Sequence, residues 1–186
     1  MLDRIRAFMT LDRSQTEVNR ARYRALTKHL PLMYGLLIIN MVALSVSHLQ
    51  SSAPLHLTVY LPAVFICFML ARTIYYLRGR QEVVSDETIH ERLIKTILLT
   101  CPVAGVISVW GLLFLPYGDT GQNAQAIFFN AVSVVACAFC MVYLRQAALL
   151  VLTVVTLVTC GFLLAQGTLA FFAIGVNMAL VCFVIG

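Results

Sequence analysis

Long apolar runs occupy most of this chain and constrain its fold more than any other feature. The 186 residues are 61% hydrophobic and only 11% charged, whereas a soluble domain carries about 25% charged residues. A bilayer core needs roughly 20 apolar residues per helix, so the sequence has room for six spans and none for a separate soluble domain. The predicted fold class is all-α integral membrane: a six-transmembrane-helix bundle of three hairpins.

A basic segment precedes the apolar runs. Residues 1–30 are expected to form a cytoplasmic juxtamembrane helix near the anionic inner leaflet, with a solvated, disordered arm as the alternative for its first half. The membrane domain follows over residues 31–186. Its six predicted spans are about 31–48, 57–77, 93–115, 124–143, 147–165 and 168–186.

The distribution of positive charge predicts the topology. Of the 13 Lys and Arg residues, seven lie in 1–30, five in 72–95 and one at Arg145. The loops 49–56, 116–123 and 166–167 contain none. Because cytoplasmic loops are enriched in Lys and Arg, both termini are expected in the cytoplasm. The basic residues flank spans, so the net charge of +5 indicates the lipid bilayer as the partner and not nucleic acid.

Local signals refine the helix ends. Pro31 is expected in the first turn of the first span, where spare N–H groups tolerate it. Ser85-Asp86 predicts a capped helix start before the third span. Four arginines are interpreted as inner-leaflet anchors: Arg72, Arg78, Arg80 and Arg145. Arg72 lies inside an apolar stretch but near enough to its end for the long side chain to reach the interface.

The predicted outer face carries the candidate ligand or pH site. His48 and His56 bracket the first outer loop, Asp119 is the single charged residue on that face, and Tyr60 and Tyr117 flank them. Two imidazoles and a carboxylate have the chemistry to bind a divalent metal or a haem-like ligand, or to titrate near neutral pH. The alternative is that these are ordinary interfacial residues, and no metal is assigned to them.

Three asparagines within the apolar runs are candidates for interhelical polar contacts. Asn40 and Asn177 are expected at similar depths and are predicted to pair, because an amide in lipid seeks a partner. Asn130 is expected nearer the outer surface, close to Asp119. Trp110 is interpreted as an outer belt residue.

Catalytic signatures are absent from this sequence. It contains no phosphate-binding glycine loop, no HExxH and no GxSxG, so no catalytic residue and no cofactor are assigned to this segment. All six cysteines fall inside apolar runs. The Cys137-x-x-Cys140 spacing is therefore interpreted as packing and not as a redox or zinc motif.

Several short stretches, taken in order, resemble a known family. They are Pro31-Leu-Met-Tyr34, Ala53-Pro-Leu-His-Leu-Thr-Val-Tyr60, Leu115-Pro-Tyr-Gly-Asp119, Val142-Tyr-Leu-Arg145 and Ile174-Gly-Val-Asn-Met178. Together they are similar to the N-terminal MASE-like multi-pass membrane sensor region of bacterial GGDEF and GGDEF/EAL cyclic-di-GMP signalling proteins. The resemblance covers about residues 20–186.

The resemblance implies a sensory or anchoring input domain in the bacterial inner membrane. It also implies a homodimer and a cytoplasmic diguanylate cyclase effector domain in cis, using GTP and Mg and beginning beyond Gly186. The chain itself carries neither the GGDEF nor the EAL signature. A small multi-pass transporter or channel subunit is the alternative function, and an intramembrane enzyme is a third.

Overall fold

The chain is a bundle of antiparallel helices. The computed structural model describes residues 15–79, 84–165, 167 and 169–185, which form helices and short connections with no strand among them. The helices are α2 (Thr16–Ser47), α3 (Leu61–Gly79), α4 (Asp86–Leu112), α5 (Thr120–Cys140), α6 (Arg145–Ala165) and α7 (Leu169–Ile185), with a short π-helix, η1 (His56–Tyr60), before α3. Arg80 and residues 1–14 lie outside the described residues.

The predicted helical membrane bundle agrees with these elements. Helices α2, α4, α5 and α6, and η1 together with α3, are each long and apolar enough to cross a membrane. The sixth predicted span also forms a helix, α7, of 17 residues. Its apolar part, Phe171–Leu180, is shorter than the other five.

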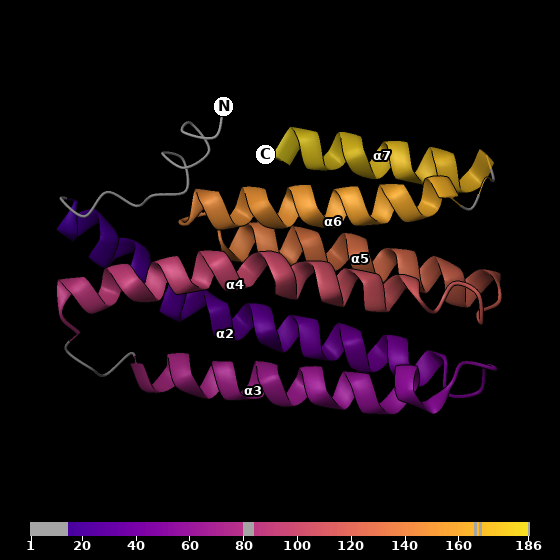
Figure 1. Ribbon diagram of the computed structural model, residues 1–186, viewed down its shortest axis with the longest axis horizontal. Coiled ribbons are helices and arrows are strands. Elements are labelled where there is room, and N and C mark those ends of the chain that lie inside the picture. Colours follow the sequence, from indigo (N-terminus) through magenta and orange to yellow (C-terminus); the bar gives the residue numbers. More distant parts are fainter. Residues whose placement is uncertain (1–14, 80–83, 166, 168, 186) are drawn as a thin grey trace.

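The helices lie side by side, and each is aligned with the long axis of the molecule (Figure 1). The end at which α2 begins, α3 ends and α6 begins is called the charged end, because the Lys and Arg residues of the described chain gather there. Helices α2, α4, α5 and α6 pack together at the centre, α3 packs mainly against α2, and α7 packs against α6. Although α3 and α4 are consecutive, their backbones approach closely at few points.

Helix α2 differs from the prediction at Pro31. The expected first-turn position is wrong, because Pro31 lies inside a continuous 32-residue helix. A proline removes one helical hydrogen bond, but in membrane helices neighbouring groups compensate for such a loss. At 1.5 Å per residue the helix is about 48 Å long. Its basic first half is therefore a rigid extension of the predicted span.

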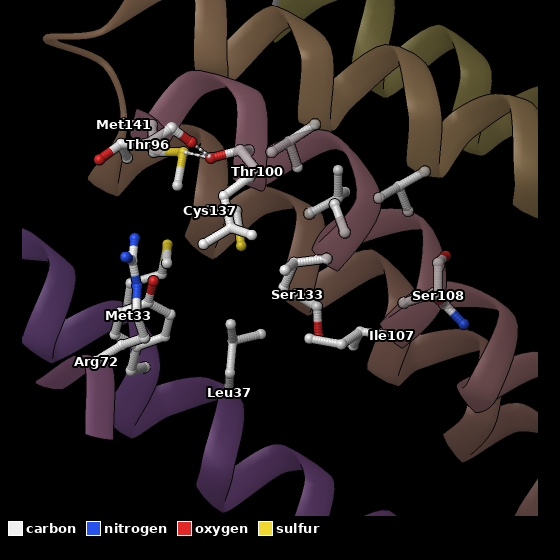
Figure 2. A pocket seen from close by; sticks show the side chains of 18 residues that line it. Met33, Leu37, Arg72, Thr96, Thr100, Ile107, Ser108, Ser133, Cys137 and Met141 are labelled. Carbon is white, nitrogen blue, oxygen red and sulfur yellow. Dashed lines mark hydrogen bonds between the residues drawn. The ribbon is translucent and has the colours of Figure 1, made fainter. Parts of the chain in front are cut away.

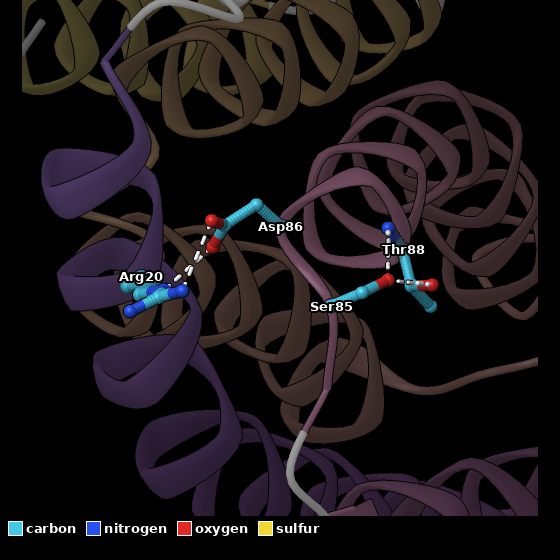
Figure 3. A network of polar contacts seen from close by, with 4 residues as sticks. All are labelled: Arg20, Ser85, Asp86 and Thr88. Carbon is cyan, nitrogen blue, oxygen red and sulfur yellow. Dashed lines mark hydrogen bonds and ion pairs between the residues drawn. The ribbon is translucent and has the colours of Figure 1, made fainter.

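The start of α4 agrees with the prediction (Figure 3). The Ser85 hydroxyl accepts a hydrogen bond from the Thr88 N–H at 3.4 Å, as an N-cap does. The Asp86 carboxylate accepts hydrogen bonds from Arg20 Nε, at 2.5 Å, and from Arg20 Nη2, at 3.0 Å. This bidentate pair joins the basic half of α2 to α4 at the charged end.

Pro62 leaves one carbonyl of the π-helix without a donor in the helix. The Leu61 N–H bonds the His56 carbonyl, five residues back. In the same register Pro62 would bond the Leu57 carbonyl, but proline has no N–H. Trp110 Nε1 instead donates to that carbonyl at 3.0 Å. The interpretation of Trp110 as a belt residue is therefore wrong: it is 2% exposed and satisfies the orphaned backbone group.

Candidate functional site: a polar-lined cavity inside the bundle

The residues of the predicted outer site differ in burial. His48 is fully buried, whereas His56, Tyr60, Tyr117 and Asp119 are exposed. A metal centre needs converging ligands, and the described residues hold no group of three or more His, Cys, Asp and Glu side chains suited to a metal ion.

Asp119 has a structural role. Its carboxylate accepts the Gln122 N–H at 2.8 Å, and the Gln122 side chain accepts the Asp119 N–H at 3.0 Å. This reciprocal arrangement is a capping box at the start of α5. Gln122 Nε2 also donates to the Ser47 carbonyl at 2.7 Å. The cap thereby fastens the start of α5 to the end of α2.

His48 is the buried member of the predicted set. Its Nδ1 lies 3.0 Å from both the Leu44 carbonyl and the Ser47 hydroxyl. Its Nε2 is buried and has no protein partner. The ring packs against Phe114, with centroids 4.5 Å apart. His48 is therefore held rigidly as a buried residue, with one nitrogen unused.

Two of the predicted asparagines join helices, but in different pairs from those expected. Asn40 Nδ2 donates to the Phe129 carbonyl and to Ser133 Oγ, both at 3.3 Å, and so links α2 to α5 instead of contacting Asn177. Asn130 is 1% exposed and accepts the Ser108 hydroxyl at 2.5 Å, linking α5 to α4. Asn177 is exposed on α7.

These polar links border a cavity of about 50 Å³ between the central helices (Figure 2). Arg72, Thr96 and Met141 lie at one end and Ser108 at the other. The polar side chains in its lining are Tyr34, Arg72, Thr96, Thr100, Ser108, Asn130 and Ser133. A water needs about 10–15 Å³ of such volume. The space therefore accommodates a few waters or one very small ligand.

A directed chain of hydrogen bonds forms the charged-end wall of the cavity. Thr96 Oγ1 donates to the Arg92 carbonyl at 2.8 Å, so its proton is already used. The Tyr76 hydroxyl, 2.9 Å away, must therefore donate to Thr96. Arg72 Nη2 donates in turn to Tyr76 at 3.0 Å, and the guanidinium carbon lies 5.1 Å from the centre of that ring. Arg72, predicted as an inner-leaflet anchor, is half-buried and contributes through Tyr76 to the contact between α3 and α4.

Sequence reasoning missed this cavity, although a signal was present. Thr96, Thr100, Ala104 and Ser108 recur at every fourth position of α4, which places small and polar groups on one helix face. Cys137 also lines the cavity, and the five cysteines whose side chains are described are free.

Comparison with known proteins adds no assignment. No family model matches the chain, and neither a curated protein nor a solved structure shows significant similarity to it.

Proposed function

We propose that this chain is the membrane-embedded sensory and anchoring input domain of a bacterial signalling protein. Both termini lie in the cytoplasm, and a homodimer controls a cytoplasmic diguanylate cyclase domain in cis. The cavity of about 50 Å³ between the central helices, whose mainly apolar lining includes several polar side chains, is the observation that carries this proposal. The sequence resemblance to MASE-like regions names the output.

The size and chemistry of the cavity favour sensing over transport. A transport pathway usually carries ionisable residues near mid-membrane. Here α5 and α7 contain no charged residue, in α6 the charge is at Arg145, its first position, and the charged residue that lines the cavity, Arg72 of α3, lies at one end of it. A cavity of this volume holds a small ligand or water, and filling or emptying it changes how the helices around it pack.

Helix α6 lines the cavity and also packs against the outer helix α7. Val151 and Val155 of α6 line the cavity, and α7 packs against α6. A shift of α6 reaches α7 through this contact, and α7 runs toward the charged end (Figure 1). A cytoplasmic effector connected to α7 would receive the shift as a change in helix position or dimer register.

The orientation follows from the charged end. Arg20, Arg78 and Arg145 belong to elements that begin or end there, and positive charge on that side favours the cytoplasm. Cysteine labelling of intact cells tests this. Single cysteines at the connection 49–55 should react with a membrane-impermeant maleimide, and ones at 84–85 should not.

The first test of the function is to determine the coding sequence that follows Gly186 in the natural reading frame. A GGDEF-type domain should follow, and the whole protein in nanodiscs should make cyclic-di-GMP from GTP and Mg²⁺. Substituting Ala104→Leu, which fills the cavity, should change that rate severalfold. The control Ala63→Leu, on an exposed position of α3, should not. A reading frame that stops near Gly186 would overturn the proposal, and solute flux through proteoliposomes would favour transport.

A further inference from the structure

The outer face of α7 carries a polar side chain at the middle of the helix. Asn177 lies eight residues from each end of Leu169–Ile185, which is about 12 Å along the helix from either end. Its side chain is exposed and forms no hydrogen bond with the part of the chain that the structure describes. If α7 crosses the bilayer, this amide lies near the membrane centre.

Lipid does not suit this position. An amide without a hydrogen-bond partner is strongly disfavoured in an apolar environment, and acyl chains offer neither a donor nor an acceptor. The other exposed side chains described for α7 are all apolar: Phe172, Ala173, Val176, Leu180, Phe183 and Val184. Asn177 therefore indicates that another protein surface covers this part of α7.

The bundle itself does not supply that surface. Gly175 and Met178 are the buried positions among the described side chains of α7. Helix α6 packs on this buried side, where Cys160 Sγ donates to the Gly175 carbonyl at 3.2 Å. Asn177 lies about 200° around the helix from Gly175. Its face is thus turned away from α6, and α7 lies at the edge of the bundle (Figure 1).

The residues that share a face with Asn177 have the spacing of a helix-pairing seam. Ala173, Asn177, Leu180 and Val184 are separated by four, three and four residues, and all four are exposed. They are called the α7 seam. This heptad spacing keeps one stripe turned toward a partner helix in a left-handed pair, which is the commoner geometry between membrane helices. A single asparagine in such a stripe fixes the register of the pair.

A second copy of the chain fits this seam for reasons of symmetry and depth. A primary amide both donates and accepts, so two of them can exchange hydrogen bonds across a twofold axis. Two copies have the same distribution of positive charge and therefore insert with the same orientation. Their Asn177 side chains then lie at the same depth, whereas a different protein would need its own polar group at that level.

We propose that two copies of this chain associate in parallel through the α7 seam, with their Asn177 amides hydrogen-bonded to each other. The proposal rests on the homodimer of the proposed function and identifies the surface that forms it. Helix α6 lies against α7 and also lines the central cavity through Val151 and Val155. A change in the cavity that moves α6 would therefore reach the dimer contact across one helix.

Energy transfer between whole chains labelled at the amino terminus, reconstituted in vesicles at increasing lipid dilution, tests the proposal. Asn177→Leu should raise the dissociation constant of the dimer about three- to tenfold, because it removes the interhelical amide bonds. Since the substitution removes no hydrogen bond within the described chain, its thermal midpoint in detergent should match wild type. Asn177→Gln keeps an amide and should associate more tightly than the leucine variant. The control Val176→Leu, at an exposed position outside the seam, should stay within about twofold of wild type.

Disulfide cross-linking in the same vesicles locates the interface. Leu180→Cys lies in the seam, so oxidation should join two copies well above the background that the native cysteines give in wild type. Val176→Cys is equally exposed to lipid in the single chain but lies outside the seam. It should cross-link less than Leu180→Cys.

The outcomes separate an error in the interface from an error in the dimer. If Asn177→Leu associates as tightly as wild type, or Val176→Cys cross-links as readily as Leu180→Cys, the α7 seam is not the interface, and a homodimer through another surface stands. An equal loss of association in Val176→Leu and Asn177→Leu would also overturn the role of the amide. If wild type transfers no energy at any dilution, the homodimer of the proposed function fails together with its interface.

Discussion

Gly111 offers the sharpest test of how α4 and α5 pack. A Cβ built on Gly111 would lie 2.8 Å from Phe129 Cδ1 and 3.0 Å from Asn130 Nδ2. Neither neighbour has room to move. Phe129 is 1% exposed and packs edge-on against Trp110, with ring centroids 5.5 Å apart, and Asn130 is held by Ser108. The Gly111→Ala methyl group must therefore separate the two helices.

The magnitude follows from comparing glycines within this one chain. Replacing a helical glycine by alanine gains about 1 kcal/mol of helix propensity at any site, and overpacking a buried contact costs about 1–3 kcal/mol. Gly161 and Gly35 have no atom within 4 Å of the added methyl group, and at Gly105 the nearest is Val154 Cγ1, at an ordinary 3.4 Å. Gly111→Ala should therefore unfold about 1–3 kcal/mol more easily than Gly161→Ala.

Trp110 provides the assay. It is the single tryptophan of the chain and touches Phe129, so its fluorescence during unfolding by sodium dodecyl sulfate in mixed micelles reports on this contact. Gly161→Ala and Gly35→Ala should match or exceed wild-type stability, and Gly105→Ala should lie close to them. Equal stability of Gly111→Ala and Gly161→Ala would refute the packing of α4 on α5 described here.

Three further substitutions probe other parts of the molecule. His48→Phe keeps the ring contact with Phe114 but removes both the unpartnered Nε2 and the Nδ1 contact with the Leu44 carbonyl. Because a neutral hydrogen bond contributes about 0.5–1.5 kcal/mol, unfolding in detergent should show a loss no larger than that, and a larger loss would show that Nε2 also has a partner. Trp110→Phe leaves the Leu57 carbonyl without a donor and should cost about 1–3 kcal/mol of unfolding free energy, followed by circular dichroism. Unchanged stability would contradict the account of the π-helix. Asn177→Leu removes an exposed amide from α7 and should weaken homodimerisation about three- to tenfold, measured by energy transfer between labelled copies in vesicles. Failure of wild type to associate would remove the dimer from the proposed function.

The helices could be predicted from the sequence because the physics that sets them is local. Apolar length and flanking charge decide where a chain can cross a bilayer, and the Ser85 cap and the turn before Thr120 depend on neighbouring residues. The continuous helix through Pro31 could not be predicted in the same way. Whether a proline begins a helix or lies inside it depends on packing by the rest of the bundle.

The candidate site was harder to predict. The sequence indicates how deep a residue lies in the membrane, but it does not indicate which helices are neighbours. Asn40 and Asn177 lie at similar depths, but α2 packs against α5 and α7 against α6, so the two amides do not meet. The outer residues illustrate a different ambiguity. Asp119 has the chemistry of a ligand and equally that of an N-cap, and its position three residues before Gln122 completes a capping box.

Polar residues of α4 form hydrogen bonds with three neighbouring helices, α2, α3 and α5. Ser108 holds α5 through Asn130, Thr96 holds α3 through Tyr76, and Asp86 holds the basic start of α2 through Arg20. Between these contacts the same helix lines the cavity. Interhelical hydrogen bonds in membranes contribute only about 0.6–1.7 kcal/mol each, so no single polar contact fixes the position of α4. A small ligand in the cavity would therefore alter several helix contacts through this one helix.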